Sequence, residues 1–378
     1  MSTSIAKQPC RNDINTGYKS ANGKEHCTRC PEQGRQPFVP FSSTAVRTVA
    51  IVYTYKCTAK CSHCCLECGP MQDAVVAFEL AERCIVNMAE KGCEQVNFTG
   101  GECLLFAEDI LRLARNARAL GLRTGIATNA FWASSANSTA NLLSSLSEAG
   151  VQDLVVSSDS FHQEYIPLEN VLRIVDEAGE YGITVQVEVH RRGARDSQLE
   201  EIGETLKEHT RNIKVSSTGP FGRWAQYRYR LGHAQRDRID VCQSVFDLSV
   251  LPNGDVYPCC SGALGGIIRK EQPSLLLLGN VSRSSLGDII ERAQESVLLN
   301  ALRICGPNGL LDLWCNDAAL QDLPPRFCGI CDLCIAVCTT LPNHDPSLLE
   351  FAVGARNTND RIRLEESWSE RAKLFPEP

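Results

Sequence analysis

Segments with the pattern of amphipathic helices end in glycine and run into short apolar segments four times in the first half of the chain. The four junctions read AEKG-CEQVNF, RALG-LRTGIAT, SEAG-VQDLVVS and GEYG-ITVQVEV. Their glycines, Gly92, Gly121, Gly150 and Gly182, are 29, 29 and 32 residues apart. Glycine just past a helix end adopts the left-handed conformation that closes the last turn. A helix, a strand and two loops take about 30 residues, so the pattern predicts a repeated helix–strand unit.

The apolar segments of these units are short and rich in β-branched residues, which is typical of parallel strands buried on both faces. The helix pattern is clearest over 107–120, where one face collects Ile110, Leu111, Leu113, Ala114 and Ala117. Six strands are expected between about 48 and 218, including Val49–Tyr53, Val96–Phe98, Leu154–Val156, Ile183–Val189 and Ile213–Val215. Such units wind right-handed into a doubly wound sheet or a barrel. The predicted fold class is α/β, a partial (β/α)6 TIM-like barrel.

After Pro220 the helix–strand pattern stops. We expect an irregular, Cys-containing N-terminal arm over 1–46, the barrel over 47–220 and a linker over 221–239. A small Cys-rich domain, short-stranded and rich in turns, is expected over 240–340, followed by a tail over 341–378 with a helix near 360–374. Within the Cys-rich domain, DLSVLPNGDVYPCC predicts a hairpin that turns at Asn253-Gly254.

Composition narrows the classes of function. The net charge is −7, with 45 acidic and 38 basic residues and no run of Lys or Arg, so no nucleic-acid partner is expected. No apolar run can span a bilayer and no signal peptide is visible, which predicts a cytoplasmic protein without a membrane partner. There are 20 cysteines, none between Cys103 and Cys242. In a reducing compartment, such clustering favours metal or redox chemistry over a disulfide scaffold.

Three cysteines follow the first predicted strand, TVAIVYTY, in the spacing Cys57-x3-Cys61-x2-Cys64. Active-site residues gather at the carboxyl ends of barrel strands. Three thiolates on one tight loop can bind three irons of a [4Fe–4S] cluster and leave the fourth iron open. A zinc knuckle is the alternative, although zinc sites usually pair CxxC with a second pair of ligands. The adjacent Cys65 and Cys68 are expected to be packing residues, with a redox role or further metal ligation as the alternatives.

This motif resembles the signature of the radical S-adenosylmethionine (SAM) superfamily. The second strand ends in Thr99-Gly100-Gly101-Glu102, which resembles the GGE motif of that family. The resemblance implies that SAM binds the open iron and that these four residues contribute to the SAM site. It also implies that an electron from the cluster, supplied by a flavodoxin- or ferredoxin-type donor, cleaves SAM to a 5′-deoxyadenosyl radical that abstracts a substrate hydrogen atom.

A second group of cysteines lies in the Cys-rich domain. Cys242, Gly254 and Cys259 resemble the first half of the SPASM/twitch extension of radical SAM enzymes, and Gly219–Arg223 resembles a PxGR turn of the same enzymes. The run Cys328-x2-Cys331-x2-Cys334-x3-Cys338 has its own, ferredoxin-like spacing. The resemblance implies at least one auxiliary [4Fe–4S] cluster, and a structural zinc site is the alternative. Its expected ligands are Cys242, Cys259 and two or more of Cys328, Cys331, Cys334 and Cys338.

The remaining cysteines have weaker assignments. Cys260, Cys305 or Cys315 could complete a second auxiliary cluster. One of them could also return a hydrogen atom to the substrate, as a thiol does in some radical SAM epimerases, and Cys260 is the candidate we select. The N-terminal arm holds Cys10, Cys27 and Cys30, to which we assign no function.

The ends of the fourth and fifth strands supply further candidates. The strand-end rule places Ser157, Asp159 and His162 at the pocket, where Asp159 or His162 would handle protons or bind the SAM ribose or the substrate. Alternation puts Glu188 and His190 on one face of the fifth strand. Arg191 or Arg192 would reach a carboxylate of SAM or substrate. Ser157, Glu188 and Arg191 are the expected cofactor contacts; a hydrogen-bonded loop and a solvated charge pair are the alternatives.

The expected function is maturation of a ribosomally made peptide by crosslinking, epimerisation or oxidation, because SPASM-type enzymes commonly act in this way. A small-molecule epimerase or dehydrogenase acting on an amino sugar or nucleoside is the second interpretation. A non-enzymatic iron–sulfur electron carrier is the third, and the GGE element argues against it.

Overall fold

The computed structural model describes residues 45–192, 196–230, 234–235, 242, 244–260, 274–314, 317–345 and 348. Several predictions fall elsewhere in the chain. The helix expected near 360–374 lies outside the described residues, as do Cys10, Cys27, Cys30 and Cys315, and of Cys305 only the backbone is described.

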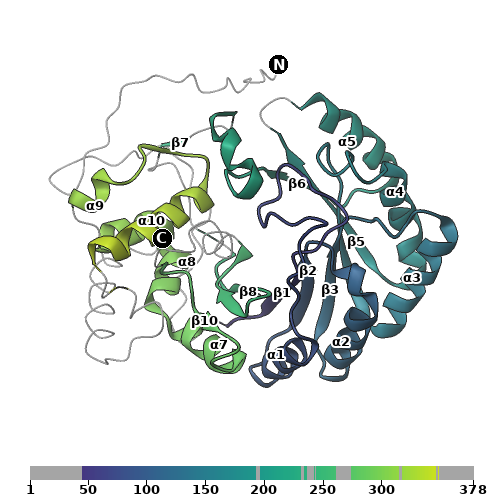
Figure 1. Ribbon diagram of the computed structural model, residues 1–378, viewed down its shortest axis with the longest axis horizontal. Coiled ribbons are helices and arrows are strands. Elements are labelled where there is room, and N and C mark those ends of the chain that lie inside the picture. The colour runs from purple at the N-terminus through teal and green to yellow at the C-terminus, as the bar shows by residue number, and fades with distance from the viewer. Residues whose placement is uncertain are drawn as a thin grey trace, which may run out of the picture. The chain divides into compact units, whose positions relative to one another are not determined.

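Six parallel strands follow one another in chain order across the first part of the sheet. They are β1 (Thr48–Thr54), β2 (Gln95–Gly100), β3 (Arg123–Thr128), β4 (Val151–Ser157), β5 (Thr184–Arg191) and β6 (Ile213–Ser217). Five helices lie along the outer face of this curved sheet (Figure 1). They are α1 (Phe78–Glu90), α2 (Ala107–Ala119), α3 (Ala136–Ala149), α4 (Leu168–Glu177) and α5 (Ser197–His209). The predicted α/β class with a partial (β/α)6 barrel is confirmed.

The glycines at the helix ends have the expected conformation. Gly92, Gly121, Gly150 and Gly182 have φ values of 72°, 80°, 91° and 70°, in the left-handed region that glycine enters without a steric penalty. Helix α2 buries Ile110, Leu113, Ala114 and Ala117, while the fifth predicted member, Leu111, is half-buried. Local sequence therefore sets both the ends of these helices and the faces that they turn toward the sheet.

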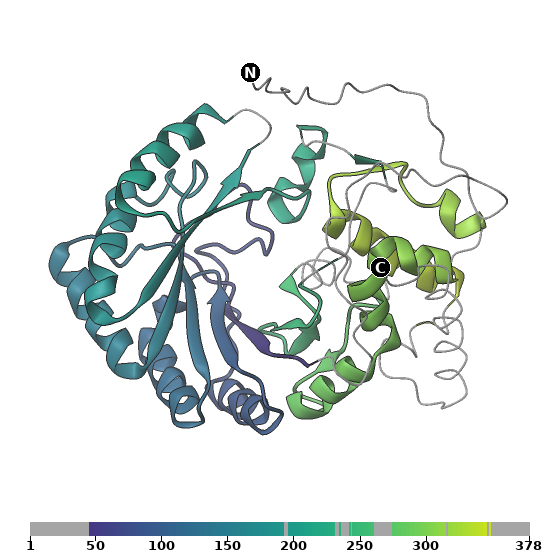
Figure 2. The same ribbon diagram turned by 180° about the vertical axis from the view of Figure 1, so that it is seen from behind.

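The Cys-rich part extends the same sheet. Strand β8 (Asp247–Val250) pairs parallel with β1, and β9 (Asp255–Tyr257) and β10 (Gly279–Asn280) continue the sheet antiparallel. The view from behind shows this green extension beside the purple β1 (Figure 2). The predicted hairpin is present and turns at Gly254, whose φ is 87°. The two halves of the chain therefore share one sheet.

Beyond the hairpin the domain is richer in helix than the sequence analysis expected. Its helices are α7 (Leu286–Glu295), α8 (Val297–Trp314), α9 (Asp317–Gln321) and α10 (Ile330–His344), and α8 is interrupted at Gly306. The expectation of a short-stranded, turn-rich domain was wrong here, because apolar residues at helical spacing, such as Leu286, Ile289, Ile290 and Ala293, are buried on one side of α7.

Short elements complete the part of the chain that the structure describes. They are the 3₁₀ helices η2 (Cys103–Phe106), η3 (Ala178–Tyr181) and η4 (Gly222–Arg230), and a small sheet of β7 (Ala234–Gln235) and β11 (Arg326–Phe327). Element η4 occupies part of the predicted linker. Within the described part of the chain, no helix is both long and apolar enough to cross a membrane.

Candidate active site

The loop that follows β1 brings three predicted cysteines into one buried cluster. Cys57 and Cys61 are buried and Cys64 is half-buried, and all three pack with Phe161 and Trp224. The loop closes through backbone hydrogen bonds between its two ends, from the Cys57 amide to the Gly69 carbonyl at 3.2 Å and from the Gly69 amide to the Tyr55 carbonyl at 3.1 Å. These contacts hold the loop against the carboxyl end of the strand.

The environments of the three thiols differ. Burial raises the pKa of Cys57 to about 11 and lifts the pKa of Cys61 further. A hydrogen bond from the Cys68 thiol lowers the pKa of Cys64. The Cys57 sulfur also accepts weak hydrogen bonds from the Ala59 amide at 3.4 Å and from the Asn129 side chain at 3.5 Å. Cys68, which the sequence analysis assigned to packing, is thus a buried member of the same cluster.

The end of β2 packs directly against this loop. The Gly101 amide donates to the Thr54 carbonyl at 2.7 Å, and the Glu102 amide donates to the Lys56 carbonyl at 2.9 Å. A Cβ atom on Gly100 would lie 2.3 Å from the Thr54 oxygen, and one on Gly101 would lie 2.1 Å from the Lys56 oxygen. Only glycine lets the two backbones approach so closely. Thr99, the residue before them, is half-buried within β2.

The Glu102 carboxylate joins the ends of β2 and β3. It is fully buried and accepts hydrogen bonds from the Thr128 hydroxyl at 3.0 Å, the Asn129 amide at 2.7 Å and the Leu104 amide at 3.1 Å. Burial raises its pKa to about 7, although these hydrogen bonds oppose the shift. Asn129 also donates to the Thr58 hydroxyl at 3.0 Å. The GGE segment and the end of β3 therefore support the cysteine loop together.

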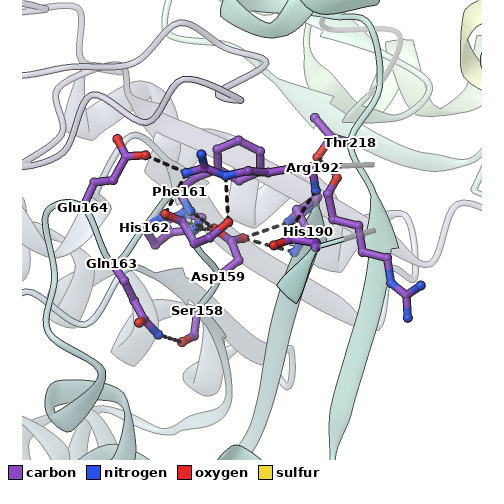
Figure 3. Close-up of polar contacts among 12 residues, drawn as sticks. Ser158, Asp159, Phe161, His162, Gln163, Glu164, His190, Arg192 and Thr218 are labelled. Carbon is purple, nitrogen blue, oxygen red and sulfur yellow. Dashed lines mark hydrogen bonds and ion pairs between the residues drawn. The ribbon is translucent and has the colours of Figure 1, made fainter. Parts of the chain in front are cut away.

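The carboxyl ends of β4 and β5 meet at Asp159 (Figure 3). One carboxylate oxygen accepts hydrogen bonds from the amides of Phe161 and His162 at 3.0 Å each and lies 2.9 Å from the His162 ring nitrogen Nδ1. The other accepts from the His190 amide at 3.1 Å. Burial opposes ionisation of Asp159, but the hydrogen bond with the His162 ring and the nearby ring of His190 outweigh it and hold its pKa far below the ordinary value. Of the predicted candidates, the structure thus brings Asp159 and His162 together.

The other candidates on these strands lie apart from that carboxylate. Glu188 accepts from the Ser216 hydroxyl at 3.0 Å and pairs with Lys214 at 3.0 Å, both on β6. Ser157 is half-buried and pairs in register with Glu188, and Arg191 is exposed.

Of Arg191 and Arg192, it is Arg192 whose guanidinium makes hydrogen bonds and a ring contact. Its guanidinium donates to the Ser160 hydroxyl at 2.8 Å and to Glu164 at 2.6 Å, and lies 4.4 Å above the Phe161 ring. Figure 3 shows this stack beside the Asp159 group.

The Cys-rich domain gathers several of its predicted ligands. Helix α10 carries Cys331, Cys334 and Cys338, and Cys328 lies just before it. The hydrogen bond with the Cys338 thiol, together with burial, raises the pKa of Cys334, and burial raises the pKa of Cys242. The predicted cysteines that follow β9 are the buried Cys259 and the exposed Cys260.

Comparison with protein families matches both halves of the chain. Residues 51–208 match the model of the radical SAM superfamily, and residues 242–334 match the SPASM iron–sulfur cluster-binding domain. The chain belongs to the radical SAM superfamily and carries a SPASM domain. It is therefore a radical SAM enzyme. Its cofactors are SAM, the [4Fe–4S] cluster of the radical SAM domain and at least one auxiliary [4Fe–4S] cluster in the SPASM domain.

Individual relatives span much of the chain. It is 22% identical over 296 residues to YydG of Bacillus subtilis (strain 168), a protein named for peptide biosynthesis, in a match covering 76% of this chain and 91% of YydG. It is 28% identical over 195 residues to GTP 3′,8-cyclase of Marinobacter nauticus, covering 48% of this chain and 57% of that enzyme. The solved structure of Streptococcus suis SuiB bound to precursor peptide SuiA aligns at a TM-score of 0.43 and 16% identity, covering 76% of this chain and 75% of SuiB.

The residues of the radical SAM domain fit these cofactors. The three thiols of the β1 loop lie in one buried cluster, and hydrogen bonds to their sulfurs, such as that from Asn129, are of the kind that tunes iron–sulfur clusters. Gly100 and Gly101 form a backbone cradle that any side chain would fill. The three thiols therefore suit a cluster with one open iron, and the backbone cradle suits a small ligand beside that iron.

Sequence reasoning missed three residues of this site. Asn129 follows β3, so the same strand-end rule would have found it. Arg223 was noted only as part of a turn, yet it donates to the carbonyls of Cys61 at 2.9 Å and Cys68 at 2.8 Å. His63 was given no function, although its ring stacks on Phe161 with the centroids 4.3 Å apart. No local signal in the sequence pointed to these two contacts.

Proposed function

We propose that this protein modifies a peptide by radical chemistry, forming a crosslink, epimerising a residue or oxidising a side chain. The observation that carries the proposal is the similarity to YydG, a protein named for peptide biosynthesis, which covers 76% of this chain and 91% of YydG. The match to GTP 3′,8-cyclase covers 57% of the relative and favours, as a second candidate, a small-molecule substrate such as a nucleoside.

Within this proposal Cys57, Cys61 and Cys64 ligate the cluster, and the Thr99–Glu102 segment holds SAM beside it. Once bound, the reduced cluster and SAM supply a 5′-deoxyadenosyl radical. The buried loop, closed at its ends and packed on the GGE segment, fixes the positions of the three thiols and excludes water from them. A flavodoxin- or ferredoxin-type protein is the proposed electron donor.

Asp159 and His162 are the proposed polar contacts to SAM or substrate. The carboxylate remains ionised because its pKa is held low, so Asp159 accepts hydrogen bonds and does not act as an acid. The adjacent His162, 2.9 Å away and half-buried, is the member of the pair that can exchange a proton. Ser157, Glu188 and Arg191 remain proposed cofactor contacts at the same edge of the sheet.

The SPASM domain supplies two further roles in the proposal. Cys242, Cys259 and cysteines of the 328–338 run ligate at least one auxiliary cluster. Cys260 is the proposed hydrogen-atom donor, since its side chain is exposed.

The test begins with anaerobic reconstitution with iron and sulfide, reduction by dithionite and addition of SAM. Wild type is expected to form 5′-deoxyadenosine, and a variant with Cys57, Cys61 and Cys64 replaced by Ala is expected to form none. A pool of translated random-sequence peptides is then added in D2O. Gain of deuterium at unchanged composition indicates epimerisation, and loss of two hydrogen atoms indicates a crosslink or an oxidation.

The outcomes separate the candidates. Turnover of nucleosides with no modified peptide would replace the peptide proposal with the small-molecule one. If the wild-type protein assembled clusters but never cleaved SAM, the proposed chemistry would be wrong. If Cys260→Ser still epimerised peptide at the wild-type rate, the hydrogen-donor role of Cys260 would be refuted and the rest of the proposal would stand.

A further inference from the structure

Three side chains with metal-binding groups converge beside the cysteine loop. His63 comes from that loop, Asp159 follows β4, and His190 lies near the end of β5. One ligand atom from each lies within 4.8 Å of the other two. Among the described residues, no other group of three or more histidine, cysteine, aspartate or glutamate side chains has ligand atoms this close together. Figure 3 shows the Asp159 and His190 members pointing toward each other.

Two of the three residues have a ring nitrogen without a hydrogen-bond partner. The Nδ1 atoms of His63 and His190 are both buried and lack hydrogen-bond partners. The nearest carboxylate oxygen to His190 Nδ1 belongs to Asp159, at 3.6 Å, which is beyond hydrogen-bond distance. A buried polar atom left without a hydrogen bond is unfavourable, so two of them side by side indicate a ligand.

The charge of the group also calls for a cation. Asp159 is fully buried and ionised, and its ion-pair partners among the described residues are His162 and His190. Arg192 lies nearby but is directed to Ser160 and Glu164. A metal ion bound here would place a positive charge beside this buried carboxylate.

We propose that His63, Asp159 and His190 form a mononuclear site for a divalent first-row transition-metal ion, separate from the iron–sulfur clusters. Two imidazoles and a carboxylate form a donor set that suits zinc or ferrous iron, and three protein ligands leave at least one coordination position open. His162, hydrogen-bonded to the same carboxylate, would orient Asp159 as residues behind metal ligands commonly do.

The geometry requires a small contraction on binding. In a tetrahedral site with bonds of about 2.0–2.1 Å, ligand atoms lie about 3.3 Å apart. The rings of His63 and His190 can turn inward, because no hydrogen bond holds their Nδ1 atoms. Asp159 stays in place, since three backbone amides fix its carboxylate. An oxygen or nitrogen of substrate on the open position would then lie beside the loop that carries Cys64.

Zinc is the probe for the test. The reconstituted holoenzyme, without SAM, is incubated anaerobically with zinc sulfate and desalted, and zinc and iron are counted by mass spectrometry. X-ray absorption at the zinc edge reports the ligands. We expect one zinc per chain with nitrogen and oxygen ligands at about 2.0–2.1 Å, whereas zinc bound at cysteines would show sulfur at about 2.3 Å. Zinc content and zinc ligands are measured without turnover, so the result does not depend on whether the protein modifies a peptide.

Variants decide between this site and any other. His190→Gln should lose the bound zinc and keep its iron, and it should fold because the Nδ1 atom that it replaces makes no hydrogen bond. Asp159→Asn should also lose the zinc. The control is His209→Gln, at an exposed His–Asp pair with Asp176 on the outer helices, which should keep it. Absence of zinc from wild type, sulfur ligation, or retention of zinc by His190→Gln would each overturn the proposal.

Discussion

Arg223 provides a quantitative test of how the cluster loop is held. Its guanidinium donates to the carbonyls of Cys61 at 2.9 Å and Cys68 at 2.8 Å, and its backbone amide donates to the Cys64 carbonyl at 3.2 Å. Gly222 before it sits so close to the loop that a Cβ atom would lie 2.4 Å from the Cys64 oxygen. The guanidinium therefore bridges two points of the loop that carries the cluster ligands.

The expected magnitude follows from the two side-chain bonds. A hydrogen bond to a charged group contributes about 1.5–3 kcal/mol. Lysine keeps the charge but lacks the planar fork, so Arg223→Lys should lose one of the two bonds. That free energy corresponds to a rise of about 10- to 150-fold in the equilibrium for local opening of the loop. Arg223→Met should lose both bonds and open the loop more often than Arg223→Lys.

The rate of iron release to a ferrous chelator, measured anaerobically on the reconstituted enzyme, reports this opening. Release from a variant with Cys57, Cys61 and Cys64 replaced by Ala gives the contribution of the auxiliary iron, which is subtracted. The control is Arg118→Lys, because Arg118 donates to the Glu148 carbonyl at 3.3 Å on the exposed surface and should leave the rate unchanged. Wild-type release from Arg223→Met would refute the reasoning.

Two further substitutions test the supports of the loop. Gly101→Ala puts a Cβ atom 2.1 Å from the Lys56 oxygen and should abolish 5′-deoxyadenosine formation. The control is Gly179→Ala, whose Cβ atom would meet nothing within 4 Å and which should keep that activity. Equal activity of the two variants would contradict the role of the glycine cradle. Asn129→Ala removes a hydrogen bond to the Cys57 sulfur and should lower the cluster reduction potential by about 20–40 mV, as measured by a redox titration followed by electron paramagnetic resonance. An unchanged or higher potential would argue against that bond.

The barrel was predictable because its determinants are local. Each of Gly92, Gly121, Gly150 and Gly182 closes its helix within one turn, and a short segment with apolar, β-branched residues follows. The sequence alone therefore indicated the order of the elements and the edge at which the strands end. The strand-end rule then placed Asp159 at the edge where the structure finds it with its histidines.

Other features depend on contacts between distant parts of the chain. The parallel pairing of β8 with β1 joins residues about 200 positions apart, and the sequence of neither strand identifies the other as its partner. Helix α7 is a different case, since the spacing of its apolar residues is local and is typical of a helix. The approach of His63 to His190 depends on the curvature of the sheet, which periodicity does not encode.

The cluster loop depends both on a local sequence pattern and on contacts with distant parts of the chain. Its cysteine spacing is local and was recognisable in the sequence, but the loop has little regular structure of its own. It is instead held from outside, by the glycines at the end of β2, by Asn129 after β3 and by Arg223 after β6. Arg223 also precedes the SPASM domain in the chain, so a shift of that segment would act directly on the Cys61 and Cys68 carbonyls. The position of the cluster ligands is therefore set by the whole barrel edge.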